Sequence, residues 1–374
     1  MTPADTYGTR RAGRPNEGAT VTEAVRRPWL LDGVRAELVD TPRYRANVLQ
    51  AGTGDGLPVV LIHGNCSSAH LYRDTMLALA GRSIAIDLRG FGDSEGLPVD
   101  ATRGLTDFSD DVAAVLDVLA VDRAVVVGWS MGGGVALQLA IDHPGLVAGL
   151  VLESPVPPVG YGGTDADGAL LDKDGAGTGG GGANPDFVAR LQAGDWSDES
   201  VTSPRSVFRS SYVAAGYRTD REDLWVASML TTVTGAGNYP GDSTPTGAWP
   251  GFAPGRTGVL NTMAPTHLDL TAVVDLDPKP PIAWIRGTDD AIVSDATFFD
   301  LNMLGKAGIV PGWPGDEIAP PQPMVTATRR VFDRYRDGGG AVAEYAWEGV
   351  GHSPHLERPE AFAAIIEALR SGAK

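Results

Sequence analysis

The sequence of 374 residues contains a single cysteine, Cys66. One cysteine excludes an internal disulfide and any metal site built from several cysteines, so nothing marks an oxidising compartment, and we expect a cytoplasmic location. A Gly-Lys-Ser/Thr phosphate loop is also absent. The pair His352 and His355 lacks the glutamate of a zinc-protease helix. We therefore predict neither a cofactor nor a metal.

Positive charge is scarce as well. The chain has 30 Lys and Arg against 47 Asp and Glu, a formal net charge of -17. Such acidity repels polyphosphate and anionic lipid, so we expect no nucleic-acid and no membrane partner. Residues 1–28 hold five arginines but no apolar run, which argues against a signal peptide, a twin-arginine signal or a spanning helix. We expect these residues to form a flexible leader.

What the chain does contain is an alternation of short apolar runs with longer amphipathic ones. This alternation predicts βαβ units on a mostly parallel sheet flanked by helices, an α/β fold. Eight runs are expected to be strands: 34–39, 44–49, 58–62, 83–87, 124–128, 149–152, 281–286 and 341–347. Helical spacing of aliphatic residues predicts helices over 108–119, 131–141 and 361–369.

The periodicity fades between residues 155 and 280, where Gly, Pro, Thr, Asp and aromatic residues dominate. A structureless stretch of this length is unusual in a compact domain, so we predict a cap insertion with short helices near 186–191 and 222–230. The core then comprises residues 29–154 and 281–374. A second insertion is expected at 294–323, and no internal repeat is found.

The segment Gly128-Trp129-Ser130-Met131-Gly132 follows an expected strand and opens an expected helix. A sharp turn in that position exposes a serine hydroxyl at the end of the strand, and small neighbours leave room for it. The bare pattern is common by chance in a glycine-rich chain, so its context carries the argument. Ser130 is the candidate nucleophile.

A nucleophilic serine needs a base and an acid that orients the base. His352 follows the last expected strand, on the same sheet edge as Ser130, and is the candidate base, with His355 as the alternative. Asp290 follows the strand before it and is the candidate acid. Asp289 beside it and Glu153, at the end of another strand, remain open.

These motifs resemble those of the α/β-hydrolase superfamily. The resemblance rests on Leu61-Ile62-His63-Gly64-Asn65, on Asp87-Leu88-Arg89-Gly90-Phe91-Gly92-Asp93-Ser94, on the Ser130 turn, on Gly287 to Val293 and on Gly351-His352. It covers roughly residues 34–154 and 281–369, and the order Ser, Asp, His agrees with it. It implies an eight-stranded sheet, favours Asp290 as the acid, and implies an oxyanion hole made by the backbone N–H groups of Asn65 and Met131.

The loop His63 to Ser68 is similar to that of haloalkane dehalogenases, which attack with a carboxylate. In this chain Ser130 stands in the place of that carboxylate. A serine alkylated at carbon would form a stable ether. Acyl transfer is therefore expected: hydrolysis of a carboxylic ester or lactone through an acyl-enzyme. Carbon–carbon bond hydrolysis, amide hydrolysis, cofactor-free perhydrolysis and a noncatalytic small-molecule receptor remain open because they fit the same residues.

Tryptophans beside the nucleophile and in the cap are candidates for substrate binding. They are Trp129, Trp196, Trp225 and Trp249. Such side chains can wall an apolar pocket for a small ester or lactone, or can form the core of the cap. The oligomeric state has no signal in the sequence.

Overall fold

The computed structural model describes residues 30–54 and 56–373, so the expected leader at 1–28 lies outside the described residues. Eight strands form one sheet in the order β1-β2-β4-β3-β5-β6-β9-β10. Pairing is antiparallel from β1 to β2 and from β2 to β4, and parallel across the rest. The prediction of a mostly parallel, eight-stranded sheet is confirmed. Its strands are β1 Val34–Asp40, β2 Arg45–Ala51, β3 Val59–Ile62, β4 Ser83–Ile86, β5 Ala124–Trp129, β6 Val147–Glu153, β9 Ile282–Gly287 and β10 Val342–Trp347.

The central strands read as continuous apolar runs because both faces of the sheet are covered. Every residue of β3, β4, β5 and β6 is buried. A sheet that presented one face to water would instead show alternating polar residues. The edge strand β10 does alternate between half-buried and exposed positions.

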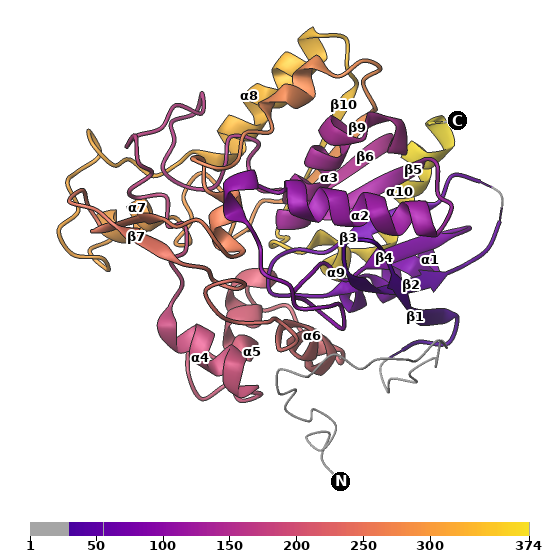
Figure 1. Ribbon diagram of the computed structural model, residues 1–374, viewed down its shortest axis with the longest axis horizontal. Helices are drawn as coiled ribbons and strands as arrows, with labels where there is room; N and C mark the ends of the chain where they lie inside the picture. Colours follow the sequence, from indigo (N-terminus) through magenta and orange to yellow (C-terminus); the bar gives the residue numbers. More distant parts are fainter. Residues whose placement is uncertain (1–29, 55, 374) are drawn as a thin grey trace.

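Helices cover both faces of this sheet (Figure 1). On the side nearer the viewer, α2 packs against α3, and α3 contacts β5 and β6. On the far side α1 packs against α10, which also contacts β5 and β6. These core helices are α1 Arg73–Ala78, α2 Thr106–Val118, α3 Met131–Asp142, α8 Met324–Asp337, α9 Pro354–Glu357 and α10 Pro359–Gly372. In the described part of the chain, none of the helices has the length and apolar character needed to cross a bilayer.

The segment between β6 and β9 lies outside the main sheet. It contains short helices and a two-stranded hairpin: α4 Pro185–Ala193, α5 Pro204–Val207, η5 Phe208–Tyr212, α6 Glu222–Met229, β7 Ser243–Pro245, β8 Phe252–Pro254, η6 Leu260–Met263 and η7 Thr271–Asp275. The second insertion carries α7 Leu301–Lys306. Both insertions lie beside each other in Figure 1, and the Trp249 Nε1–H donates to the Pro311 carbonyl across them at 2.9 Å.

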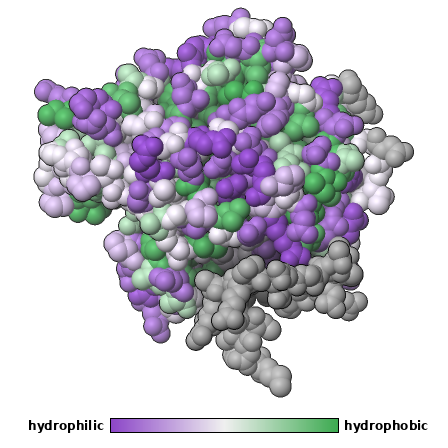
Figure 2. Space-filling model, in the orientation of Figure 1, coloured by the Kyte–Doolittle hydropathy of each residue, from purple (hydrophilic) through white to green (hydrophobic). Residues whose placement is uncertain are grey.

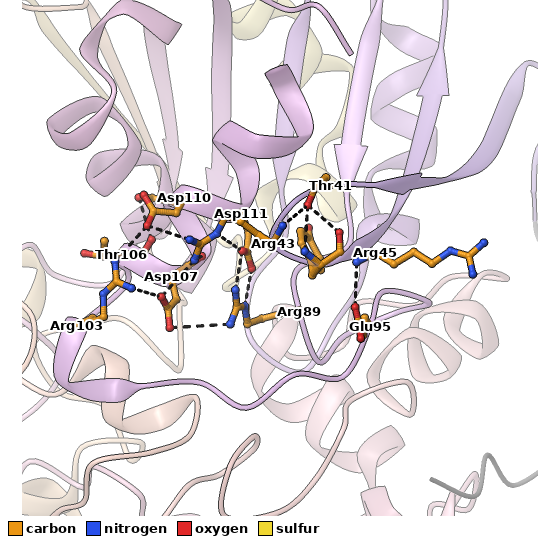
Figure 3. A network of polar contacts seen from close by, with 12 residues as sticks. Thr41, Arg43, Arg45, Arg89, Glu95, Arg103, Thr106, Asp107, Asp110 and Asp111 are labelled. Carbon is orange, nitrogen blue, oxygen red and sulfur yellow. Dashed lines mark hydrogen bonds and ion pairs between the residues drawn. The ribbon is translucent and has the colours of Figure 1, made fainter. Parts of the chain in front are cut away.

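A network of arginines and aspartates fixes the loop after β4 against α2 (Figure 3). Arg89 donates to both carboxylate oxygens of Asp111, at 2.5 and 2.6 Å, and Arg43 donates to the same group at 2.7 Å. The Asp111 side chain is fully buried, so these charge-assisted bonds compensate for its lost hydration.

The molecular face in Figure 2 mixes hydrophilic and hydrophobic residues.

Candidate active site

Ser130 occupies a strained turn between β5 and α3. Its φ and ψ are 56° and -121°, a conformation that residues other than glycine rarely adopt. The surrounding structure holds it there: its N–H donates to the Glu153 carbonyl at 2.9 Å, and its own carbonyl accepts from Val156 at 3.0 Å. The half-buried Ser130 thus lies at the N-terminus of α3, where the first N–H groups of a helix have no acceptor within the helix.

Close backbone contacts explain the glycines around this turn. A Cβ on Gly132 would lie 2.2 Å from the Ile62 carbonyl oxygen, and one on Gly64 would lie 3.0 Å from the Ser130 Cβ. The end of β3 and the loop after it therefore pass directly beside the serine. A larger residue at Gly132 would push the two apart.

Asp290 and His352 form a buried pair. The His352 Nδ1 lies 2.9 Å from Asp290 Oδ2 and 3.0 Å from Oδ1, and the two residues are 1% and 5% exposed. The backbone N–H groups of Ile292 and Val293 donate to Asp290 Oδ1 at 2.8 and 2.9 Å. A carboxylate against Nδ1 favours the tautomer with the proton there, which leaves the Nε2 lone pair free to act as a base.

The two alternative acids, Asp289 and Glu153, make no hydrogen bond to His352 through their side chains in the described part of the chain. Asp289 is exposed, and its carboxylate accepts from the Thr288 hydroxyl at 3.0 Å. Glu153 pairs with the other candidate base: its Oε1 lies 2.8 Å from His355 Nδ1 and accepts from the His355 N–H at 2.7 Å. The structure thus brings Asp290, and neither alternative, to His352.

All these groups follow the ends of neighbouring strands, since β5, β6, β9 and β10 are consecutive in the sheet. Parallel strands end at the same edge, so residues distant in sequence meet there. The Trp129 Nε1–H donates to the His352 carbonyl at 2.8 Å, which fixes the histidine loop to the strand that carries Ser130. No hydrogen bond joins the Ser130 hydroxyl to His352 among the described residues. Such contacts are often long before substrate binds, so that pairing belongs to the proposal below.

The loop after β3 passes beside Ser130. Asn65 is half-buried, and its side-chain oxygen accepts from the Cys66 N–H at 2.9 Å. Met131, directly after Ser130, is the first residue of α3, so its N–H lies at the start of that helix. Burial raises the pKa of the Cys66 thiol to about 12, so this cysteine stays protonated and is a poor nucleophile.

The tryptophans occupy different surroundings. Trp129 is fully buried beneath both imidazoles, with ring centroids 5.5 Å from His352 and 5.3 Å from His355. Trp225 of α6 is buried against Phe208 of η5, and Trp249 packs on Gly305 of α7. The Trp196 carbonyl accepts from Arg205. Their expected role in substrate binding stays a prediction.

Sequence reasoning missed Tyr212, a buried residue of η5 that packs beside His352. Its ring centroid lies 6.4 Å from that of His352 and 5.6 Å from that of Trp129. No motif marks this tyrosine, because its position depends on how the segment between β6 and β9 packs against the rest of the chain. Among residues 30–54 and 56–373, no group of three or more His, Cys, Asp or Glu side chains is arranged to hold a metal ion.

Comparison with known proteins matches one family model and several curated relatives. The family model described as alpha/beta hydrolase fold matches residues 58–177. The 2-hydroxymuconate semialdehyde hydrolase of Pseudomonas sp. (strain CF600) is 36% identical over 125 residues, which are 30% of this chain and 44% of that protein. Epoxide hydrolase B of Mycobacterium tuberculosis is 31% identical over 263 residues, covering 68% of this chain and 61% of the other. The matches thus span less than two thirds of these relatives.

Among solved structures, a serine hydrolase from the polyaromatic-hydrocarbon-degrading bacterium Cycloclasticus zankles aligns with a TM-score of 0.58. The alignment covers 91% of this chain and 99% of that one at 15% identity, a likeness of fold alone. The order of the sheet, the strained serine turn and the matching family model agree with one another. Together they show that the chain has the α/β-hydrolase fold and that residues 58–177 match the model of that family.

Proposed function

We propose that this chain is a serine hydrolase that cleaves a carboxylic ester or lactone through an acyl-enzyme. One observation carries the proposal: the strained Ser130 shares its sheet edge with the buried Asp290–His352 pair. A carboxylate, an imidazole and a serine hydroxyl in this order are the parts of a nucleophile activated by a base.

In the proposed mechanism, Asp290 holds the proton on His352 Nδ1, and Nε2 accepts the proton of the Ser130 hydroxyl. The Ser130 oxygen attacks the carbonyl carbon, and the N–H groups of Asn65 and Met131 donate to the developing oxyanion. The tetrahedral adduct collapses, and the alcohol leaves with the proton from His352. Water, deprotonated by the same histidine, then releases the acid and restores Ser130.

The similarity to epoxide hydrolase B does not extend to a proposal of epoxide opening. A serine that opened an epoxide would be left with an ether bond, which, unlike an ester, water does not hydrolyse at neutral pH. The segment shared with the semialdehyde hydrolase supports a second candidate, hydrolysis of a carbon–carbon bond beside a ketone. That reaction would use the same serine, histidine and aspartate.

The test is hydrolysis of p-nitrophenyl acetate, butyrate and octanoate, and of a lactone, by the wild type and by Ser130→Ala. Removing the nucleophile should lower kcat about a thousandfold or more. Ser154→Ala is the matched control: this serine also has a positive φ, 41°, and it follows the neighbouring strand β6. The control should retain wild-type turnover.

Two outcomes would change the proposal. Wild-type turnover by Ser130→Ala would remove the serine mechanism. If the wild type hydrolyses no ester or lactone but cleaves a diketone, the second candidate replaces the first. Tight, saturable binding without turnover of any of these compounds would instead support a receptor.

A further inference from the structure

Tyr212 joins the cap to the loop that carries Asn65. Its hydroxyl donates to the carbonyl oxygen of Asn65 at 3.0 Å and also lies 3.3 Å from the carbonyl oxygen of Cys66, a second acceptor. The tyrosine ends η5, a single turn of π-helix, and is only 6% exposed. A buried phenol hydroxyl needs such a partner, so this contact holds the two segments together.

The segment after Tyr212 is attached to the histidine loop. A Cβ on Gly351 would lie 2.5 Å from the Ala214 nitrogen, so the two backbones are in direct contact. The carboxylate of Glu357 accepts from the N–H of Gly351 at 2.8 Å and from that of Ala214 at 3.2 Å. Tyr212 is therefore anchored on the histidine side of the site and reaches across to the Asn65 side.

The loop that Tyr212 contacts is itself strained. Cys66 has a φ of 46°, which costs free energy for a residue with a side chain. The Asn65 side chain holds the Cys66 N–H from one side, and the Tyr212 hydroxyl holds the neighbouring carbonyls from the other. Tyr212 therefore holds the two peptide groups that follow the Asn65 N–H and so limits rotation of the backbone at Asn65 and Cys66.

We infer that Tyr212 is a positioning residue, which fixes the backbone of Asn65 so that its N–H points at the oxyanion of the reacting ester. This inference rests on the proposed function, because it assigns Asn65 to the oxyanion hole. Burial raises the pKa of Tyr212 well above its usual value, so the hydroxyl stays protonated and remains a donor.

Tyr212→Phe tests this inference, since it removes only the hydroxyl. Loss of a whole oxyanion donor costs about a hundredfold or more in kcat, and a misplaced donor should cost less. We expect kcat on the best p-nitrophenyl ester to fall about tenfold, with KM within about twofold of the wild type. Affinity for butylboronic acid should fall by a similar factor, because the boronate adduct on Ser130 places an oxygen where the oxyanion forms.

Tyr335→Phe is the matched control. Tyr335 is also buried and donates its hydroxyl to a backbone carbonyl, that of Pro280, at 2.5 Å, on the far end of β9 from the site. Thermal midpoints of the two variants should fall by similar amounts, while kcat and boronate affinity should fall in Tyr212→Phe alone. Boronate binding is measured by calorimetry and needs no turnover.

The outcomes separate this inference from the function it rests on. If Ser130→Ala is inactive but Tyr212→Phe keeps wild-type kcat and boronate affinity, the inference is wrong and the serine mechanism stands. Equal losses of kcat in Tyr212→Phe and Tyr335→Phe would reduce Tyr212 to a structural role. A raised KM with unchanged kcat would make it a substrate contact. Full activity of Ser130→Ala would overturn both proposals.

Discussion

Two carboxylate–imidazole pairs lie at the same edge of the sheet, Asp290 with His352 and Glu153 with His355. Their Nδ1–oxygen distances are nearly equal, 2.9 Å in the first pair and 2.8 Å in the second, and both pairs are buried. They differ in what surrounds the imidazole. Both rings pack against Trp129 of β5, but the His352 ring also packs against Tyr212 of η5.

The His355 ring also packs against Trp129, but its other neighbours enclose it. It packs against Tyr72 at 4.8 Å and Phe362 at 5.9 Å, and its Nε2 is buried without a hydrogen bond to the described residues. Glu153 also accepts from the His355 backbone N–H, which ties α9 to β6. The comparison teaches that a carboxylate partner does not by itself distinguish a catalytic imidazole from a structural one, because both histidines have such a partner.

The largest expected effect separates the two histidines. His352→Ala should lower kcat on the accepted ester about a thousandfold or more. His355→Ala removes the partner of a buried carboxylate, so it should lower the thermal midpoint by several degrees and leave most of kcat at 15 °C. Paired kinetics and thermal unfolding check this. A greater loss of kcat in His355→Ala would reverse the assignment of the base.

Substitution of the two carboxylates should likewise affect turnover at Asp290 and stability at Glu153. Asp290→Asn keeps the size of the side chain but no longer selects the Nδ1 tautomer, so kcat should fall about a thousandfold. Glu153→Gln should cost about 3 kcal/mol of unfolding free energy, because a buried pair loses one charge. Steady-state kinetics and urea unfolding of both variants provide the measurement. Equal kinetic losses would mean that both pairs take part in turnover.

Another buried carboxylate, that of Asp300, accepts no hydrogen bond from an imidazole among the described residues and sharpens the comparison. It accepts from the N–H groups of Gln322 and Asn302 at 2.6 and 2.9 Å, and burial raises its pKa to about 6. The folded chain therefore keeps the Asp300 carboxyl protonated at pH values at which the unfolded chain has already lost that proton. As pH rises from about 4 to about 6, its contribution to the unfolding free energy should fall by up to about 3 kcal/mol.

Asp300→Asn cannot titrate, so it serves as the reference. The unfolding free energy of the wild type minus that of the variant should decrease by up to about 3 kcal/mol between pH 4 and pH 7. Urea unfolding at four pH values measures it. A difference that stays constant across this range would show that Asp300 titrates as it does in the unfolded chain.

Much of the fold was predictable because its signals are local. The expected strand 124–128 became β5 with one more residue, and the expected helix 131–141 became α3. The expected cap helix 222–230 became α6, Glu222–Met229. Hydrophobic period and turn glycines are properties of a short window of sequence, so they survive without tertiary contacts. The hairpin of β7 and β8, each three residues long, has too few residues to show a period.

By itself, the sequence determined the sheet, its main helices and the glycine-flanked serine turn, since each follows from residues close together in the chain. Only the tertiary structure decided that Asp290, and neither Asp289 nor Glu153, lies against His352, and that Glu153 meets His355 instead. It alone brought Tyr212 to the loop after β3. These contacts join segments 62, 202 and 147 residues apart, and their geometry arises from packing across strand ends and between cap and core, which no local pattern encodes.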